Sequence, residues 1–326
     1  MADINLLKAR GKRAFPDPTA VFIMNRVRAI VGSERALPPT EQGRLAAACL
    51  HKLEGLEDGD PTPRELAALE LMIRITRPAP LVHSGIPDDF KTPEQSRIFA
   101  SWPQFRDALK PYAARIGRID TAGLTLSASA TVGTGFLVAP GLLMTNRHVL
   151  ADLSHGTGQL ETGQALVRFQ YEADSFDPIE PRNITGVAAV HPSLDAVLLR
   201  VESGTSEPTI PVEFAADAGE LPDELDVVVA GYPAEMSDRN PLFLRSTFGQ
   251  NLGVLRAAPG QITGRVTGGF SHDCSTLGGN SGSPVFRMST AEVIGLHTGG
   301  SFLWNNQAVD GGSLTEFVKG IKGGGQ

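Results

Sequence analysis

The stretch STLGGNSGSPVF, residues 275–286, combines four serine or threonine residues with three glycines and then passes through Pro284 into a short apolar run. Glycines permit backbone conformations that other residues rarely adopt, so a Gly-Asn-Ser-Gly turn can aim several backbone N–H groups at one point. Such a turn suits the stabilisation of a developing oxyanion, for which the Gly279 and Ser281 amides are the candidate donors. A glycine-rich turn alone is usually structural, so its meaning depends on the segments upstream.

Two upstream segments contain the partners that a reactive serine needs. A serine hydroxyl is a poor nucleophile at neutral pH, and it needs a base within hydrogen-bond reach and a carboxylate that orients the base. The segment GTGFLVAPGLLMTNRHVLAD, residues 133–152, contains His148, and the segment HPSLDAVLLRVE, residues 191–202, contains Asp195. With Ser281 they follow the order His, Asp, Ser, which indicates a nucleophilic triad.

Other acidic residues and one other histidine fit this pattern less well. Asp152 lies four residues after His148, too close for its side chain to turn back onto the ring. Asp174 and Asp177 lie in a stretch that is typical of a solvated loop rather than of a strand end. His191 opens the turn before Asp195 and is expected to cap that turn.

His272 and Cys274 form the sequence HDC, which raises a metal site or a thiol nucleophile as alternatives. No second pair of ligands is spaced to complete a metal site, so Cys274 is interpreted as a small packing residue. An α/β-hydrolase is also excluded, because that fold has the order Ser, Asp, His and needs a glycine where this chain has Ser283. The remaining histidines are expected in surface or loop positions: His51, His83 and His155.

Together these motifs resemble the trypsin/chymotrypsin clan of serine peptidases and, within it, the bacterial glutamyl-endopeptidase-like branch. The resemblance covers roughly residues 113–321 and includes EVIGLHTGG, residues 292–300, which is similar to the strand that lines the clan's primary specificity pocket. It implies two six-stranded β-barrels with the active site in the cleft between them. It also implies His148 as general base, Asp195 as its orienting carboxylate and Ser281 as nucleophile.

The same resemblance implies a specificity pocket that includes Thr276, His297 and Gly299. A hydroxyl donor and an imidazole suit a substrate carboxylate, and an imidazolium would suit it better, so cleavage after Glu or Asp is expected. The residue before the serine is Asn280, where the clan's digestive enzymes have an aspartate that pairs with a newly cut N-terminus. Asn280 cannot form this ion pair, so activation by that route is not expected.

Helical patterns occupy the first quarter of the chain. They begin at capping residues or prolines and end at glycine or proline, over residues 17–32, 40–55 and 62–78. The third begins with Thr62 and Glu65 at capping-box spacing. These patterns predict a small amphipathic bundle over residues 1–80.

The rest of the chain has a different texture. Residues 81–112 predict a proline-marked connection with one further helix. From residue 113 to residue 326, short β-prone runs alternate with Gly, Pro, Asp and Asn. This pattern predicts a mainly β fold: a chymotrypsin-like double-barrel peptidase domain that is preceded by the all-α bundle and ends in a C-terminal helix.

Composition excludes several classes of protein. With 326 residues, a net charge of −7, 41% hydrophobic and 20% charged residues, the chain is typical of a soluble globular protein and does not predict nucleic-acid binding. Cys49 and Cys274 lie far apart, so a disulfide framework is not expected and a reducing compartment fits. No apolar run is long enough for a signal peptide or a membrane span. A cytoplasmic protein without membrane, metal or cofactor is expected.

The leading hypothesis is a serine endopeptidase that acts through an acyl-enzyme on a protein or peptide substrate. The alternative is a latent or inactive peptidase-fold module that binds peptides and is regulated by a partner. The same triad could also support esterase activity. Residues 1–80 contain no catalytic constellation, so two interpretations stay open for them: a packing extension, or an interaction module that binds a regulatory protein partner and gates the peptidase.

Overall fold

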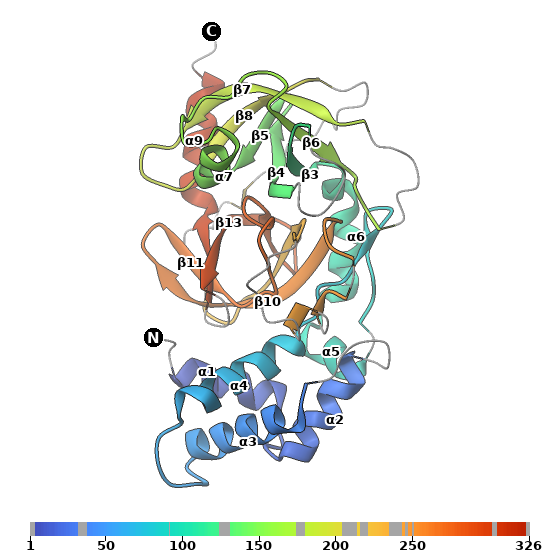
Figure 1. Ribbon diagram of the computed structural model, residues 1–326, viewed down its shortest axis with the longest axis vertical. Helices are drawn as coiled ribbons and strands as arrows, with labels where there is room; N and C mark the ends of the chain where they lie inside the picture. Colours follow the sequence, from blue (N-terminus) through green and yellow to red (C-terminus); the bar gives the residue numbers. More distant parts are fainter. Residues whose placement is uncertain are drawn as a thin grey trace.

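The computed structural model describes residues 4–31, 38–90, 92–123, 131–173, 180–203, 214–215, 221–234, 243–244, 247–249, 251–301 and 305–323. Three layers are stacked along the long axis of the molecule, with four N-terminal helices at one end and two β-barrels beyond them (Figure 1). The chain starts in the helical layer and ends beyond the far barrel. The barrel that lies next to the helices is formed by the later part of the sequence.

The first barrel is closed by antiparallel pairing in the order β3-β4-β5-β8-β7-β6. Along its strands, apolar residues either alternate with polar ones or follow one another, because the inner and outer faces of the barrel are both partly covered. In β8, for example, only Arg200 is exposed. A short helix, α7 (Arg147–Leu153), follows β5 directly. The strands are β3 (Ile116–Thr121), β4 (Thr131–Ala139), β5 (Leu142–Thr145), β6 (Ala165–Phe169), β7 (Arg182–Val190) and β8 (Val197–Val201).

The second barrel is also closed and antiparallel, in the order β10-β11-β14-β13-β12-β9. Two six-stranded barrels confirm the fold class expected from the sequence. Two of these strands, β11 and β14, were not predicted, because one is very short and the other, NNQAVD, is largely polar. The strands are β9 (Asp226–Gly231), β10 (Arg256–Val266), β11 (Gly269–His272), β12 (Pro284–Arg287), β13 (Val293–Ser301) and β14 (Asn305–Asp310).

The helical layer contains α1 (Ile4–Ala14), α2 (Ala20–Val31), α3 (Thr40–Glu54) and α4 (Pro63–Ile75). The predicted capping box is present on α4: the Glu65 backbone N–H donates to Thr62 Oγ1 and the Thr62 N–H donates to the Glu65 carboxylate. Gly55 ends α3 in a left-handed conformation, as expected for a C-cap. The helix α1 was not predicted, because its charged residues and internal glycine obscure the apolar period.

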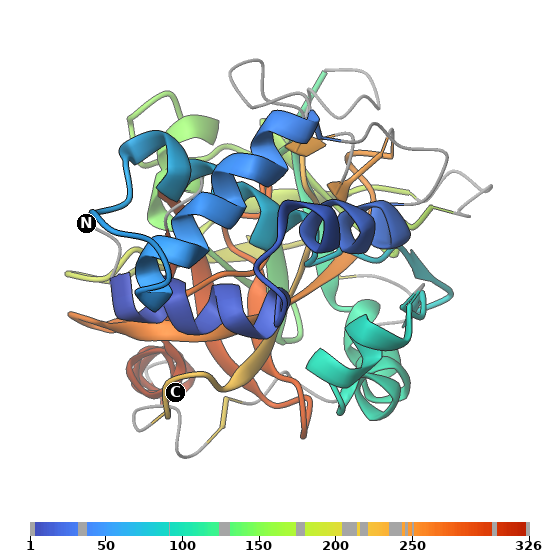
Figure 2. The same ribbon diagram turned by 90° about the horizontal axis from the view of Figure 1, so that it is seen from below.

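The helical layer shares a continuous core with the second barrel. Buried apolar residues of α1–α4 form one cluster with Val227 and Val229 of β9 and with residues of its neighbouring strands. The intervening residues Val228 and Ala230 belong to a different cluster, which includes residues of the first barrel. Alternate side chains of β9 therefore point into two different cores, because successive side chains of a strand point to opposite faces of the sheet. Figure 2 shows the helices lying across the end of the second barrel.

The helix α4 is buried on nearly all sides, which differs from the predicted amphipathic helix. Every residue from Ala68 to Ile75 is buried, including the charged residues Glu70 and Arg74. A buried charge needs a partner of opposite charge, so the polar face of α4 points to an internal ion network instead of to solvent.

The segment between the helical layer and the first barrel also packs on the second barrel. It contains a two-stranded ribbon, β1 (Val82–His83) and β2 (Ile86–Pro87), then α5 (Pro93–Ile98) and α6 (Trp102–Ala113). The helix α6 is the one predicted in this region, and it packs its Phe105 ring 5.8 Å from the Phe286 ring of β12. The domain boundaries at residues 80 and 112 stay a prediction.

The C-terminal helix α9 (Gly311–Gly323) connects the two barrels from outside (Figure 1). Asp310 caps it by accepting a hydrogen bond from the Ser313 backbone N–H at 2.9 Å. The Phe317 ring lies 5.0 Å from the His191 ring, in the turn that precedes β8. A helix attached to the second barrel therefore supports a turn of the first barrel.

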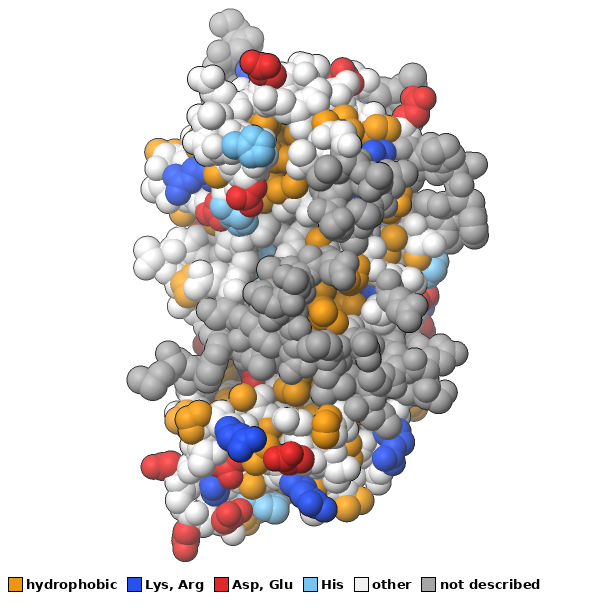
Figure 3. Space-filling view, in the orientation of Figure 1, with side chains coloured by type: hydrophobic (Ala, Val, Ile, Leu, Met, Phe, Trp, Pro, Cys, Tyr) orange, Lys and Arg blue, Asp and Glu red, His pale blue; other side chains and the backbone are white. Residues whose placement is uncertain are grey.

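On the face shown in Figure 3, the described Lys and Arg side chains lie apart from one another. Most of them lie over the helical layer. No helix in the described ranges combines the length and apolar character that crossing a bilayer demands. The compartment of the protein stays a prediction.

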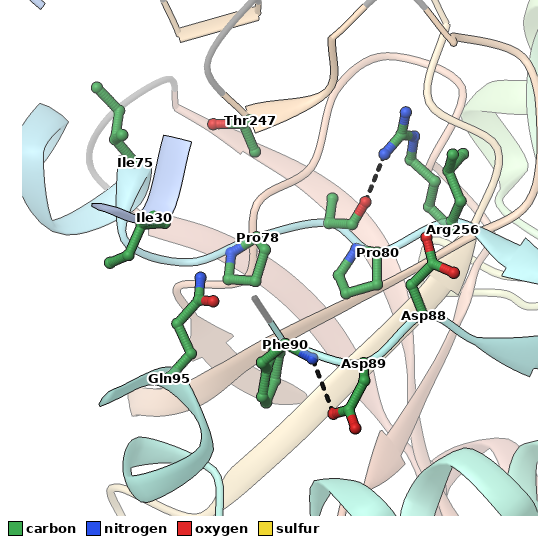
Figure 4. A pocket seen from close by; sticks show the side chains of 12 residues that line it. Ile30, Ile75, Pro78, Pro80, Asp88, Asp89, Phe90, Gln95, Thr247 and Arg256 are labelled. Carbon is green, nitrogen blue, oxygen red and sulfur yellow. Dashed lines mark hydrogen bonds between the residues drawn. The ribbon is translucent and has the colours of Figure 1, made fainter. Parts of the chain in front are cut away.

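A cavity of about 150 Å³ lies where the helical layer, the segment after α4 and the second barrel meet (Figure 4). Its walls include Ile30, Pro78, Phe90 and Arg256, and Arg256 donates a hydrogen bond to the Ala79 carbonyl beside it. The volume is below the range of about 300–1,000 Å³ that is typical of ligand pockets. None of the candidate site residues lines this cavity.

Candidate active site

His148 and Asp195 lie in contact at one end of the first barrel. His148 is the second residue of α7, and Asp195 lies in the turn before β8; β8 pairs with β5, the strand that leads into α7. The His148 Nδ1 atom is 2.7 Å from Asp195 Oδ2, and the His148 backbone N–H donates to Asp195 Oδ1 at 3.1 Å. Asn146 holds the turn by donating to the Asp195 carbonyl at 2.8 Å.

Partial burial would raise the pKa of Asp195, but the hydrogen bonds and charge of His148 outweigh burial and hold this pKa below its ordinary value. The carboxylate is therefore ionised at neutral pH and can accept from the imidazole Nδ1–H. That hydrogen bond leaves Nε2 as the ring nitrogen that can take a proton. Its rival Asp152 lies in α7 itself, and the other rivals, Asp174 and Asp177, lie outside the described residues.

Ser281 belongs to the second barrel, in the loop before β12, but its backbone is attached to the first barrel. The Ser281 carbonyl accepts from the Thr134 N–H of β4 at 2.8 Å, and the Thr134 hydroxyl donates to the Gly279 carbonyl at 2.6 Å. A Cβ added to Gly133 would lie 2.9 Å from the Val149 side chain and 3.1 Å from the Ser281 carbonyl oxygen. The serine loop and the residue after His148 thus pack against the same glycine.

The hydroxyl of Ser281 donates to the Thr298 carbonyl at 3.3 Å, and among the described residues no hydrogen bond joins it to His148. Hydrogen bonds between a nucleophile and its base are often long or misaligned without substrate. Attack on a carbonyl would require the hydroxyl to rotate from Thr298 towards the imidazole.

The two candidate oxyanion donors remain available. In the part of the chain that the structure describes, the backbone N–H groups of Gly279 and Ser281 donate to no protein acceptor, whereas the N–H groups of Asn280 and Gly282 donate to the carbonyls of Leu277 and His297. Over residues 279–282 the loop is therefore held by every second amide. The other two amides are left for a ligand, which is the arrangement that an oxyanion site needs.

We predict that Gly282→Ala destabilises the fold by about 2–5 kcal/mol, since left-handed strain and a backbone clash add together. Gly282 has φ +88°, and a Cβ there would lie 2.0 Å from the Thr134 carbonyl oxygen and 2.3 Å from Thr145 Oγ1. The matched control is Gly163→Ala, where φ is +93° but no atom lies within 4 Å. Urea unfolding measures both variants; equal losses would show that the loop is not tightly packed on β4.

The three residues expected in a specificity pocket lie around the serine loop. His297 on β13 is buried, and its backbone pairs with the loop: its carbonyl accepts from Gly282 and its N–H donates to the Ser283 carbonyl, both at 2.9 Å. Gly299 is half-buried, and no atom of the described residues lies within 4 Å of the position that its Cβ would take, so the described structure leaves the space beside it open. Thr276, also half-buried, precedes the serine loop.

His297 carries a partner that the sequence did not reveal. Its Nδ1 atom is 3.1 Å from Nε2 of the buried His272 on β11. Both β11 and β13 pair with β14, so residues 25 positions apart in sequence meet across that strand. The motif HDC was considered only as a metal or thiol site. Within the described residues, no three His, Cys, Asp or Glu side chains gather as a metal site requires.

Burial keeps both histidines neutral. It lowers the pKa of His272 to about 3, and burial together with the electrostatic cost of protonating a ring near His272 and His148 holds the pKa of His297 well below its usual range. The Gln307 backbone acts in the opposite direction on the pKa of His297 but does not offset burial. At neutral pH His297 is therefore an imidazole and not the imidazolium that would suit a carboxylate better, so any interaction with a carboxylate comes from a neutral ring.

His191 and the two cysteines have the structural roles that the sequence predicts. His191 caps its turn as predicted, because its Nδ1 atom accepts from the backbone N–H groups of Ser193 and Leu194. Cys49 and Cys274 are both buried and free. Burial raises the pKa of each thiol, which argues against a thiolate nucleophile at Cys274.

Two proteases and one solved structure are similar to this chain. A probable serine protease from Lysobacter enzymogenes is 29% identical over 235 residues, which cover 60% of this chain and 60% of that protein. A glutamyl endopeptidase from Staphylococcus aureus is 26% identical over 176 residues, 52% of this chain and 47% of that protein. The chain thus spans between about half and three fifths of the length of these relatives. A serine endoprotease structure from Yersinia pestis aligns over 67% of this chain and 66% of that chain, at 17% identity and a TM-score of 0.47.

The family comparison covers the site itself. Residues 133–296, half of the chain, match the trypsin-like peptidase domain family, and this range includes His148, Asp195 and Ser281. The match begins at the glycine that contacts both Val149 and the serine loop, and it ends one residue before His297. Because this match covers half of the chain and the chain forms two closed six-stranded barrels, it belongs to the trypsin-like peptidase domain family.

Proposed function

We propose that the protein is a serine endopeptidase that hydrolyses peptide bonds through an acyl-enzyme. The observation that carries the proposal is the 2.7 Å contact between His148 Nδ1 and Asp195 Oδ2, next to a serine loop that is bonded to β4. This contact prepares the imidazole as a base, and Ser281 lies in a loop where, within the described residues, the Gly279 and Ser281 amides donate to no protein acceptor. No cofactor enters the scheme.

In the proposed reaction, Ser281 Oγ attacks the scissile carbonyl carbon while its proton moves to His148 Nε2. The carbonyl oxygen becomes an oxyanion held by the Gly279 and Ser281 N–H groups. Collapse breaks the C–N bond, and His148 returns its proton to the leaving amine. Water then attacks the acyl-enzyme with His148 again as base, which releases the acid and restores the serine. Asp195 stays ionised and stabilises the imidazolium at each step.

We further propose that the pocket prefers Glu, or Asp, on the acyl side of the cleaved bond. The His272 Nδ1 atom accepts a weak hydrogen bond from the Cys274 N–H at 3.4 Å, so His272 carries its proton on Nε2 and donates to His297 Nδ1. The proton of His297 is then on Nε2, as a donor. With the Thr276 hydroxyl this offers a carboxylate two neutral donors beside the open space at Gly299.

The preference predicts a specific loss in Thr276→Val, which keeps the shape of the side chain and removes its hydroxyl. We expect kcat/KM for a Glu substrate to fall by about 10–100-fold, because one hydrogen bond to a charged group is lost. A Gln substrate of the same sequence is the internal control and should change by less than about 3-fold. The measurement is steady-state hydrolysis of the two peptides by both enzymes.

A cleavage profile on a proteome-derived peptide library tests the preference more broadly, with Ser281→Ala as the blank. Cleavage chiefly after Glu supports the proposed pocket. Cleavage chiefly after Lys, Arg or aromatic residues contradicts it, while leaving the peptidase activity itself supported.

A second candidate is a latent peptidase-fold module that binds peptides and becomes active only with a partner. The observation in its favour is the Ser281 hydroxyl, which is bonded to Thr298 and not to His148. A fluorophosphonate probe distinguishes the two candidates: the isolated full chain reacts at Ser281 if the site is competent and stays unlabelled if it is latent. A regulatory protein partner that binds residues 1–80 is part of this second candidate.

A further inference from the structure

The residue Asp273 holds a buried negative charge in the segment between His272, which supports His297, and Thr276 of the proposed pocket. Its side chain has no exposed surface. Its Oδ1 atom is 2.5 Å from Arg77 Nη1 and accepts from the Gln261 N–H at 2.8 Å, and its Oδ2 atom is 2.7 Å from Arg10 Nε. Burial would raise the pKa of Asp273, but the charges of Arg77 and Arg10 outweigh it and hold this pKa below its ordinary value.

Both cations come from the N-terminal part of the chain. Arg10 lies on α1, and Arg77 lies just after α4, so Arg77 is 196 residues from Asp273 along the chain and Arg10 is further still. Arg10 is itself oriented by Glu70 of α4, which it meets through two hydrogen bonds of 3.1 Å. A buried carboxylate that loses a cationic partner is left with an uncompensated charge. The contacts of Arg10 and Arg77 with Asp273 therefore link the position of the helices to that of Asp273.

Arg77 also contacts the segment of residues 273–275 through its backbone. The Ser275 hydroxyl donates to the Arg77 carbonyl at 3.0 Å. On the other side, the Cys274 carbonyl accepts from the Asn306 side chain of β14 at 2.6 Å. Residues 273–275 are therefore clamped between the helical layer and β14.

The residues on either side of this clamped segment connect it to the two donors of the proposed pocket, His297 and Thr276. His272, immediately before Asp273, supports His297 at 3.1 Å. Thr276, immediately after Ser275, presents the hydroxyl and leads into the serine loop. Because consecutive Cα atoms are only about 3.8 Å apart, a shift at Asp273 or Ser275 must move one or both donors.

We infer that Arg10 and Arg77 are positioning residues for the specificity pocket: through Asp273 and Ser275, the helical layer sets where Thr276 and the His272–His297 pair stand. This inference rests on the proposed function, because it assumes that these donors contact the substrate. The helical layer is then a part of the substrate site, acting from behind it.

The network offers its own matched control. Arg74 on α4 is as buried as Arg77 and belongs to the same cluster of charges, but its Nε atom donates to Glu70 at 3.0 Å and its partner is not Asp273. Arg74→Gln and Arg77→Gln therefore remove the same group from the same core. Only the second takes a cation directly from Asp273.

The experiment compares full-length wild type, Arg77→Gln, Arg10→Gln and Arg74→Gln with the best substrate from the peptide library. Fluorophosphonate titration is done first, so that rates refer to reactive Ser281 and unfolded molecules are not counted. For Arg77→Gln and Arg10→Gln we expect kcat/KM per reactive serine to fall by about 10-fold or more, mainly through KM. Arg74→Gln should stay within about 2-fold of wild type, and Arg77→Lys should recover part of the loss.

Equal losses in Arg74→Gln and Arg77→Gln would mean that the network only stabilises the fold, and an unchanged KM in Arg77→Gln would also overturn the inference. If Arg77→Gln yields no folded protein, Arg77→Lys is compared with Arg74→Lys, and equal KM values overturn it in the same way. A wild-type chain that neither reacts with the probe nor cleaves any peptide contradicts the proposed function instead.

Discussion

Replacing Ser281 by alanine is expected to lower peptide hydrolysis by about a millionfold in kcat, because the chain then has no nucleophile for the acyl-enzyme route. It should also abolish covalent labelling by a fluorophosphonate. The residual rate would come from substrate binding and from the Gly279 and Ser281 amides, which the substitution leaves in place. Thermal unfolding should hardly change, since the hydroxyl makes a single hydrogen bond of 3.3 Å.

The matched control for this substitution is Ser283→Ala, two residues further along the same loop. The Ser283 hydroxyl is buried and has no hydrogen-bond partner within the described residues, so its removal takes away no interaction. We expect this variant to keep its labelling and most of its activity. Labelling that persists in Ser281→Ala, or is lost in Ser283→Ala, would show that the nucleophile has been assigned to the wrong residue.

Replacing Asp195 by asparagine is expected to lower kcat by about ten-thousandfold at neutral pH. The asparagine Oδ1 can still accept from the His148 backbone N–H, so the turn and the ring position should persist. At the second atom, however, an NH₂ group replaces the carboxylate oxygen that lies 2.7 Å from Nδ1. The imidazole then turns its lone pair to that NH₂ group, and its Nε2 is protonated and cannot act as a base towards Ser281.

Asp152→Asn tests the rival aspartate on the same helix as His148. The structure gives Asp152 no contact with the ring among the described residues, so steady-state activity should stay within about 2-fold of wild type, as for most surface substitutions. A large loss in Asp152→Asn with little loss in Asp195→Asn would overturn the assignment of the orienting carboxylate. Steady-state kinetics with the same peptide substrate decides between them.

The fold was largely predictable because the strands of a barrel are short runs with a local signature. Both barrels consist of antiparallel neighbours, and most strands were recognisable as β-prone runs between turn residues. The exceptions follow from physics: β11 has four residues, and β14 is held by pairing on both sides more than by apolar side chains. Likewise α1 is a helix because it packs on α3 and α4, and its own residues show this only weakly.

The candidate site was likewise only partly predictable from the sequence. His148, Asp195 and Ser281 were recognisable because each lies in a local motif and their order along the chain is informative. Thr276 and His297 were identified through resemblance, but the charge state of His297 was not, because it depends on burial and on His272 across β14. A neutral ring and an imidazolium are indistinguishable in a sequence.

The sequence by itself determined most of the elements and the candidate site: short strands that close into barrels, a glycine-rich turn around Ser281, and a histidine and an aspartate upstream in the required order. Only the tertiary structure decided where the first quarter of the chain contacts the second barrel. Arg77 and Asp273 are 196 residues apart, and nothing in either neighbourhood indicates the other. Local patterns report on contacts between near neighbours, whereas a buried ion pair forms wherever folding removes two opposite charges from water together.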